Sequence, residues 1–426
     1  MKLYLALGII VCIGFLEAKH WAVIVAGSSG WYNYRHQADV CHAYQIFHKH
    51  GIPDENIIVM MYDDIAHNRN NPTPGIIINK PNGPDVYKGV LKDYTGKDVT
   101  PENFLNVLKG NKEAMNGIGS GRVLESGPDD NVFVYFADHG APNIIAFPSS
   151  ELHASDLKDA ITYMHENKKY KQMVFYIEAC ESGSMFDRHK LPSNINVFAT
   201  TAANGAESSY AVYYDQKRGT YLGDVYSVKW LENSDVADFS TETLQQQFKL
   251  VKEETNTSHV MEFGDLSMGS IVLGKFQGGT SKNYHTSSLN YSPSSTSDAV
   301  PSPEVSLMIL YHQIRAAKTS EEKEMYMQKL MKEQEVRSHI HKTVHRIMKK
   351  LVVSKSKQGK LLAKTAQTVM QFCYKQVVTK FRNACYDFTK YEHALRHVYI
   401  FANLCDEGLS TERILAAIEG ACPVAY

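Results

Sequence analysis

The stretches Ala137-Asp138-His139-Gly140 and Glu178-Ala179-Cys180-Glu181-Ser182-Gly183 each follow an apolar, aromatic-rich run that is typical of a buried strand. These runs are Val132–Phe136 and Met173–Ile177. A helical pattern separates them, which indicates parallel strands of an α/β sheet. Ligands and chemistry gather beyond the carboxyl ends of such strands. The sequence therefore predicts a thiol–imidazole pair, and with it a cysteine hydrolase.

A cysteine and a histidine that share one site are suited to nucleophilic catalysis. The thiolate is a strong nucleophile when a base or a positive field lies nearby. His139 could take the proton of Cys180 and later give it to a leaving amine, while the N–H groups of Gly140 and Cys180 could hold an oxyanion. The alternative is a buried structural thiol and a satisfied core histidine.

The front of the chain alternates strand and helix signals, which predicts a three-layer α/β domain over residues 19–280. Thr100 followed by Pro101 predicts a helix start, and Ser155 is expected to cap a helix with one apolar face. Further strands are expected at Trp21–Ala26, Ile57–Met61, Ile144–Phe147 and Val197–Thr200, and further helices at His36–Lys49 and around Leu244, Phe248 and Val251.

The N-terminus predicts a secretory signal peptide at residues 1–18. Lys2 precedes an apolar stretch from Leu3 to Leu16, and the small residue Ala18 suits a cleavage site. The alternative is a first buried strand or helix. No later run is apolar and long enough to span a membrane. We therefore expect a soluble protein of the secretory pathway, either lysosomal or secreted, for example into a gut lumen.

Four cysteines cluster at the end of the chain, at Cys373, Cys385, Cys405 and Cys422. In a secreted helical segment they predict two disulfides, with three possible connectivities. Cys41 and Cys180 are left over in the front part, and an unpaired thiol in an oxidising compartment is a candidate nucleophile.

Charge and composition divide the chain near Gln277–Pro303, a serine- and proline-rich stretch that predicts a flexible, protease-sensitive linker. Residues 19–280 have 23 Lys and Arg against 32 Asp and Glu, and residues 281–426 have 21 against 13. Such opposite charges favour attraction between the two parts. Helical patterns at Leu307–Ala317 and from Ser320 to about Leu351 follow. We expect a linker or activation peptide at residues 281–318 and a small all-α domain at residues 319–426.

Six longer motifs make the chain similar to a known family. They are Tyr32-Asn33-Tyr34-Arg35-His36-Gln37-Ala38-Asp39, Met60-Met61-Tyr62-Asp63-Asp64, Asn71-Pro72-Thr73-Pro74-Gly75, Asp138-His139-Gly140, the run from Tyr176 to Met185 and Thr200-Thr201-Ala202-Ala203-Asn204. With them the sequence resembles the legumain family of asparaginyl endopeptidases, which are caspase-like cysteine peptidases. The resemblance implies a caspase-like three-layer sandwich with a mostly parallel central sheet, followed by a small all-α pro-domain.

The resemblance also implies roles for single residues. Cys180 would be the nucleophile and His139 the general acid and base, with Asn33 orienting the histidine and Gly140 supplying an oxyanion N–H. The pocket for the residue before the cut would be lined by Arg35, His36, Glu178, Ser209 and Asp224. Asp138 lies where the family can form a succinimide linked to ligase activity. No metal or other cofactor is implied.

An asparagine side chain suits such a pocket chemically. Its amide oxygen can accept from Arg35, and its NH₂ group can donate to Asp224 and Glu178. Another side chain would leave these buried charges unpaired, which sharpens discrimination. Aspartate should fit only when it is protonated, so we expect cleavage after Asp at acidic pH.

By the same resemblance, the tail would be a pro-domain that blocks the site at neutral pH and leaves on acidification. Arg396 matches the arginine that the family's pro-domain aims at the active site, and we expect it to pair with Glu181. Carboxylates paired with the basic tail should have lowered pKa values, so that their stabilisation is lost as the pH falls. The implied disulfides join Cys373 to Cys405 and Cys385 to Cys422, and Cys41 aligns with a structural cysteine.

The expected activation site departs from the family pattern, because Ala316-Ala317-Lys318 contains neither Asn nor Asp. Asn283, Asn290 and Asp298 are alternatives, as is cleavage by another protease. Asn256 and Asn290 begin glycosylation sequons. Expected partners are protein or peptide substrates with Asn at the cut, the chain's own pro-domain and cystatin-type inhibitors; nucleic acid is not expected.

Two alternatives stay open beside an endopeptidase zymogen. A peptide ligase or cyclase would use the same site with an amine in place of water at the acyl-enzyme. A catalytically silent peptide-binding homologue is disfavoured by the intact Cys180 and His139. The related transamidase that attaches lipid anchors would need a membrane segment.

Overall fold

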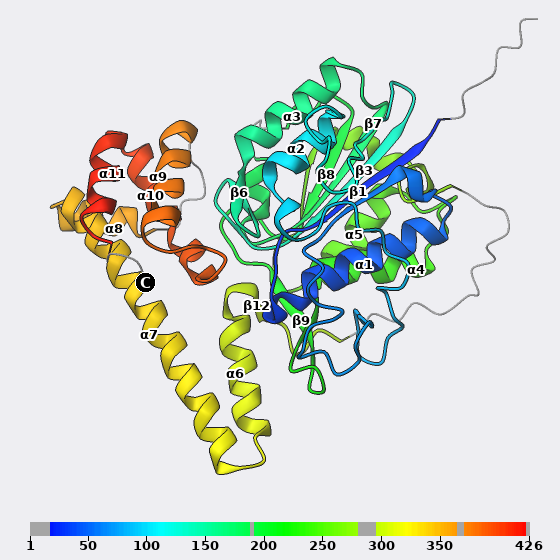
Figure 1. Ribbon diagram of the computed structural model, residues 1–426. Helices are drawn as coiled ribbons and strands as arrows, with labels where there is room; N and C mark the ends of the chain where they lie inside the picture. Colours follow the sequence, from blue (N-terminus) through cyan, green and yellow to red (C-terminus); the bar gives the residue numbers. More distant parts are fainter. Residues whose placement is uncertain (1–17, 188–190, 280–294, 364–369, 423–426) are drawn as a thin grey trace, which may run out of the picture.

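The computed structural model describes residues 18–187, 191–279, 295–363 and 370–422, which form an α/β unit and a helical unit (Figure 1). Residues 1–17 of the predicted signal peptide lie outside the described residues, as do Asn283 and Asn290. The predicted fold class, a three-layer sandwich followed by a small all-α part, is confirmed.

A six-stranded sheet with the order β11-β8-β7-β3-β1-β2 forms the middle layer. Five parallel strands, almost wholly buried, make up most of it: β1 (His20–Ala26), β2 (Ile57–Met60), β3 (Asn131–Ala137), β7 (Gln172–Glu178) and β8 (Val197–Thr201). Strand β11 (Met261–Gly264) pairs antiparallel with β8 at one edge. The continuous apolar runs found in the sequence are those of parallel strands covered on both faces.

Helices cover both faces of this sheet (Figure 1). One core packs under α1 (Tyr34–Lys49), α4 (Val225–Val236) and α5 (Leu244–Glu254). A second core packs under α2 (Pro101–Lys109) and α3 (Ala154–Glu166). Thr100 caps α2 as predicted, since its side chain accepts a hydrogen bond from Asn103 N. Helix α3 begins at Ala154, so the predicted cap Ser155 lies inside the helix.

Two small antiparallel sheets flank the strand ends. One contains β4 (Gly140–Ala141), β5 (Ile144–Phe147) and β6 (Ser150–His153). The other contains β10 (Thr220–Asp224), β9 (Tyr210–Asp215) and β12 (Val300–Pro301), in that order. Strand β12 belongs to the stretch predicted to be a flexible linker, and that prediction is wrong for this part, because backbone pairing with β9 holds it.

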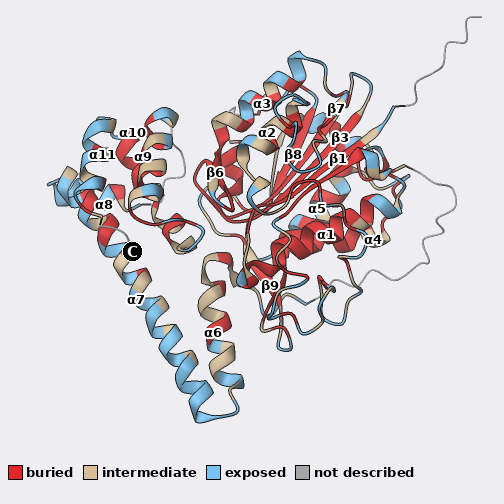
Figure 2. Ribbon diagram, viewed as in Figure 1, coloured by how far each residue is buried: buried red, intermediate tan, exposed pale blue. Residues whose placement is uncertain are grey.

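The helical unit begins with a hairpin of α6 (Val305–Ala316) and α7 (Ser320–Leu351). The first half of α7 is largely exposed (Figure 2). Its second half packs in a third apolar core, which also takes in Ala141, Ile144 and Ala146 of the α/β unit. This core contains α8 (Lys355–Leu361), α9 (Gln371–Ala384), the 3₁₀ helix η8 (Glu392–His397), α10 (Tyr399–Asp406) and α11 (Thr411–Glu419). The disulfides Cys373–Cys405 and Cys385–Cys422 are confirmed. Among the described residues, no helix combines the length and the apolar character needed to cross a membrane.

Candidate active site

The sheet brings Cys180 and His139 to the same edge. Strands β3 and β7 are parallel neighbours with Ala137 opposite Glu178, so the residues that follow them meet beyond the sheet. Gly140 allows this close approach, because a Cβ there would lie 2.2 Å from the carbonyl oxygen of Cys180. The turn after the cysteine is tight, and Glu181 has the left-handed backbone angle φ 49°.

Both residues line a cavity of about 250 Å³. Asn33, Gly140 and Glu181 line it from the α/β unit. Ser302, in the segment before α6, lines the opposite side of the cavity. Glu392, in η8, lines that side as well. The catalytic pair of the prediction therefore faces a space that later parts of the chain occupy.

His139 is held between two partners. Its Nε2 lies 2.9 Å from Asn33 Oδ1 and 3.2 Å from Glu392 Oε2, and Asn33 Nδ2 donates to the same carboxylate. Burial alone would lower the pKa of His139, but the charge of Glu392 outweighs it and raises that pKa. Burial would likewise raise the pKa of Glu392, and His139 and Asn33 instead lower it.

Cys180 is a neutral thiol in this arrangement. It is 2% exposed, and burial, with further help from Glu181, raises its pKa to about 12. Its Sγ lies 3.8 Å from Ser209 Oγ. Within the described residues, the polar contacts of His139 go to Asn33 and Glu392, so the thiol and the imidazole share a cavity without a hydrogen bond between them. The predicted nucleophile is therefore a neutral thiol in this structure.

Arg35 is the centre of the predicted specificity pocket. It is fully buried in the first turn of α1, and its Nε donates to Asp224 Oδ1 at 2.9 Å. Burial opposes its charge, but Asp224 outweighs this effect and raises the pKa of Arg35. Its Nη2 donates to Ser302 Oγ at 2.7 Å. This N–H group is therefore the part of the guanidinium that binds a polar group from another segment.

The pocket also contains buried carboxylates with unsatisfied oxygens. Glu178 Oε2 accepts from Ser227 N at 3.1 Å, but Glu178 Oε1 has no hydrogen-bond partner among the described residues. Asp224 Oδ2 has none either, although it lies 3.5 Å from His36 Nε2. Burial, followed by the charge of Asp224, raises the pKa of Glu178 well above its ordinary value. Buried acceptors of this kind are costly unless a ligand supplies a donor.

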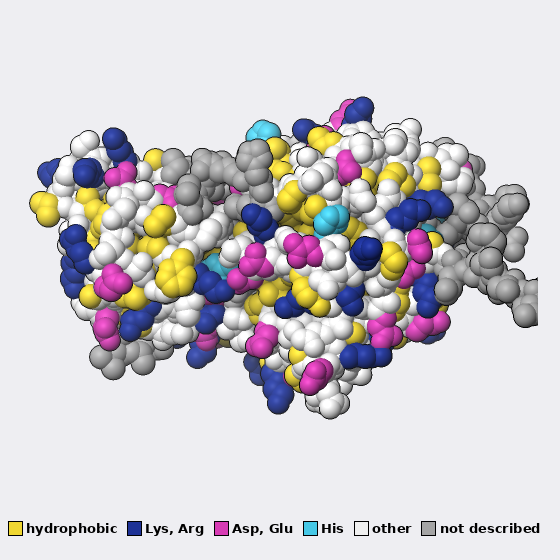
Figure 3. Space-filling model, turned by 90° about the horizontal axis from the view of Figure 1, so that it is seen from above, with side chains coloured by type: hydrophobic (Ala, Val, Ile, Leu, Met, Phe, Trp, Pro, Cys, Tyr) yellow, Lys and Arg dark blue, Asp and Glu magenta, His cyan; other side chains and the backbone are white. Residues whose placement is uncertain are grey.

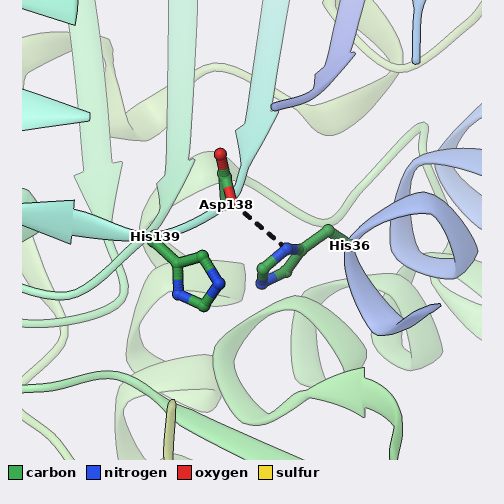
Figure 4. Close-up of side chains that lie close together, drawn as sticks. All are labelled: His36, Asp138 and His139. Atoms are coloured by element: carbon green, nitrogen blue, oxygen red, sulfur yellow. Dashed lines mark ion pairs between the residues drawn. The ribbon is translucent and has the colours of Figure 1, made fainter. Parts of the chain in front are cut away.

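Figure 4 shows His36, Asp138 and His139 close together at the sheet edge, with the carboxylate of Asp138 directed at the ring of His36. His36 Nδ1 lies 3.3 Å from Asp138 Oδ1 and 2.7 Å from Ser28 Oγ. Burial and Arg35 lower the pKa of His36, and burial raises that of Asp138 to about 7. One ligand atom from each residue lies within 4.8 Å of the others, so the group could hold a divalent metal, although the sequence predicts none.

The cleft is occupied by the chain itself. Val300 and Pro301 pair antiparallel with Ala211 and Tyr210 of β9. The next residue, Ser302, is 3% exposed, and its N–H donates to Ser209 O at 2.8 Å. An extended segment therefore runs along β9 and directs the Ser302 hydroxyl at Arg35.

The predicted latch between Arg396 and Glu181 is wrong. Arg396 pairs instead with Glu304, just before α6, and Arg337 donates to the same carboxylate at 2.8 Å. The turn of η8 directs its first residue, Glu392, rather than Arg396, at His139.

Sequence reasoning missed Glu392, Glu304 and Ser302. None of them follows a buried strand or belongs to a motif that we used, and all three act at contacts between distant segments. The sequence Pro301-Ser302-Pro303 directly before a helical pattern was the one available signal, since paired prolines favour an extended chain.

A buried cysteine and histidine at adjacent strand ends, in a cleft that already holds an extended peptide segment, define a cysteine endopeptidase. The chain belongs to the Peptidase C13 family, whose model matches residues 20–279. A second model, of the legumain prodomain, matches residues 328–422.

Curated relatives are similar along almost the whole chain. Legumain of Bos taurus is 53% identical over 95% of this chain and 93% of its own length. The vacuolar-processing enzyme delta-isozyme of Arabidopsis thaliana is 44% identical, with 95% and 91% covered. The hemoglobinase of Schistosoma japonicum is 41% identical, with 96% and 94% covered.

Proposed function

We propose that the chain is the zymogen of an endopeptidase that cuts peptide bonds after asparagine, and after aspartate at acidic pH. The observation that carries this is the donor–acceptor pattern of the buried pocket, in which Arg35 can donate while Glu178 Oε1 and Asp224 Oδ2 can accept. A carboxamide is the side-chain group that offers one acceptor and one donor at its tip. Protonated aspartate offers the same pair, and ionised aspartate would face two carboxylates.

The catalytic pair supplies the chemistry. Cys180 Sγ attacks the carbonyl carbon, His139 takes the thiol proton and gives it to the departing amine, and water then hydrolyses the acyl-enzyme. Asn33 keeps the imidazole in place through the 2.9 Å contact. The N–H of Gly140 stabilises the oxyanion in this proposal.

The chain's own segment accounts for the inactive state. Ser302 places a hydroxyl oxygen at Arg35, where the amide oxygen of asparagine would bind, but it cannot reach the two carboxylates as an NH₂ group would. Pro303 follows, so a cut after Ser302 would have to occur before proline. Glu392 meanwhile holds the catalytic histidine.

Processing and location follow the same proposal. Residues 1–18 would be removed on entry into the secretory pathway, residues 19–280 would form the mature enzyme and residues 319–426 the pro-domain. Asn256 is exposed, as a glycosylated asparagine must be. Protein substrates with accessible asparagines, and cystatin-type inhibitors, are the proposed partners.

The test is hydrolysis of fluorogenic peptides that end in Ala-Ala-Asn, Ala-Ala-Asp or Ala-Ala-Gln. The full-length protein is first incubated at about pH 4.5, near the pKa of exposed carboxyls. We expect cleavage after Asn, cleavage after Asp that grows as the pH falls, and none after Gln. Cys180→Ser is the matched inactive control. Equal rates for Asn and Gln would contradict the proposed specificity.

A further inference from the structure

Two backbone N–H groups of β9 converge on one carboxylate. Tyr213 N donates to Asp298 Oδ1 at 3.3 Å, and Tyr214 N donates to Asp298 Oδ2 at 2.6 Å. Tyr213 has the left-handed angle φ 65°, which is rare for an aromatic residue. Consecutive N–H groups beside a left-handed residue form a concave anion site, known as a nest.

This nest lies at a fixed distance along the cleft from the asparagine pocket. Ser302 occupies that pocket, Val300 pairs with Ala211, and Asp298 reaches Tyr213 and Tyr214. The segment therefore follows β9 in one continuous register. In a substrate bound the same way, the residue at the nest comes four positions before the cleaved asparagine.

We propose that the N–H groups of Tyr213 and Tyr214 form a second specificity site, which binds a carboxylate side chain four residues before the cut. The proposal rests on the proposed function, because it assumes that substrates bind along β9 as residues 298–302 do. Asp298 is then the internal occupant of this site, and aspartate or glutamate of a substrate replaces it.

The surroundings keep the nest in place and leave it receptive to an anion. The Tyr213 hydroxyl donates to Glu232 Oε1 at 3.0 Å and the residue is 5% exposed, so its side chain anchors the unusual backbone. Asp215, the neighbouring acid, accepts a hydrogen bond from the backbone N–H of Arg218 at 2.6 Å. The guanidinium of Arg218 lies 3.7 Å from the same carboxylate oxygen. The charge of Asp215 is thus partly offset next to the site.

Peptide kinetics with the acid-processed full-length protein test the proposal. The substrates copy residues 298–301, followed by Asn in place of Ser302 and Ala in place of Pro303. They carry Asp, Asn or Lys at the position of Asp298. We expect kcat/KM to be about three- to tenfold higher for Asp than for the isosteric Asn, as for charge-assisted hydrogen bonds at a partly exposed site. The gain should appear in KM, since the contact is the same in ground and transition states.

A second peptide set separates the nest from general electrostatic attraction. Moving the Asp one residue earlier should remove the advantage, because only one position reaches both N–H groups. Equal kcat/KM for Asp and Asn, or an equal advantage at both positions, would overturn the proposal. Absence of cleavage after asparagine in every peptide would instead count against the proposed function.

Hydrogen exchange tests, independently of cleavage, whether the two N–H groups bind the Asp298 carboxylate. It is measured on the full-length Cys180→Ser protein, with and without Asp298→Asn. We expect the Tyr213 and Tyr214 amides to exchange about tenfold faster in the Asn variant, while amides of the central strand β3 stay unchanged. Unaltered exchange at both tyrosines would show that Asp298 does not hold these donors.

Discussion

At the residue scale, the candidate site combines the predicted catalytic pair with groups that would keep it inactive under the proposed function. Cys180 is a buried neutral thiol and His139 is bound to Glu392. Both residues follow buried strands, which is why the sequence indicated them as candidates. Glu392 was not predictable in this way, because its role depends on the docking of a distant 3₁₀ helix.

The raised pKa of Cys180 predicts slow alkylation of the full chain. Burial holds this pKa at about 12, so almost no thiolate is present at neutral pH. We expect iodoacetamide to modify Cys180 at least tenfold faster once acid processing has exposed the cleft, measured by peptide mass spectrometry. Cys41, which is buried in the core and also has a raised pKa, is the internal control and should stay unmodified in both states. Rapid alkylation of the unprocessed chain would contradict this account.

The Glu392–His139 contact predicts an unusual pH dependence. The pKa of Glu392 is lowered, so its stabilisation is present above the unfolded value of about 4.3 and is lost as the pH falls through the lower folded value. The pKa of His139 is raised, so its stabilisation is complete below about 6.5 and is lost as the pH rises through the higher folded value. The contact is therefore strongest between these limits, and it opposes release on mild acidification.

Glu392→Gln tests this in a Cys180→Ser background, which prevents autolysis. We expect the variant to lose about 1 kcal/mol of stability near pH 5.5 and less near pH 8, because a charged hydrogen bond becomes a neutral one. The melting temperature, compared between the two proteins across pH, measures the difference. A loss that grows toward pH 8 would show that the contact behaves as a simple acid-released latch.

At the element scale, β12 is the short strand that closes the cleft. It is only two residues long, Val300–Pro301, and one of them is a proline, so it gave no strand signal. The long elements were predictable: α7 spans Ser320–Leu351 as expected, and the five parallel strands agree to within a residue or two at their ends. Apolar periodicity determines such elements, whereas β12 forms only because β9 offers a free edge.

Substituting the residue in the pocket should turn this strand into a substrate. With Ser302→Asn and Pro303→Ala together, the chain carries a carboxamide at Arg35 and a cleavable bond after it. We expect a new cut after residue 302 at acidic pH, seen as a shift in intact mass. Ser302→Asn alone is the matched control and should resist cleavage, because Pro303 remains. No cut in the double variant would show that residues 300–303 are not held as a substrate is.

At the scale of the whole molecule, the two parts meet through apolar packing of Ala141, Ile144 and Ala146 on the helical unit and through several ionic contacts. Lys375 pairs with Asp156 at 2.7 Å and Arg382 with Glu151 at 2.5 Å. Figure 3 shows basic and acidic side chains mixed over the visible face rather than segregated. The opposite net charges of the two halves, visible in the sequence, therefore act mainly as a diffuse attraction.

The two disulfides cross-link the helices of the helical unit to one another. They close loops of 32 and 37 residues. Removing Cys373–Cys405 by a double substitution to serine should cost this unit about 4 kcal/mol by the loop-entropy estimate. We expect chemical denaturation to show earlier unfolding of the tail with an unchanged α/β transition. A single transition shifted as a whole would mean that the two parts unfold together.

Under the proposed function, the occupied edge of β9 has a consequence for which proteins the enzyme could cut. Once β12 no longer pairs with β9, a substrate protein must supply the strand that pairs there. To do so, it must break its own helical or turn hydrogen bonds over several residues. Under the proposed specificity, asparagines in stable helices would be protected by their local folding, however accessible their side chains are. Such an enzyme would cut a folded substrate protein at only a few loops, and would degrade it completely once acid has unfolded it. The stability of the substrate protein at acidic pH would then determine whether it is processed at a few sites or degraded.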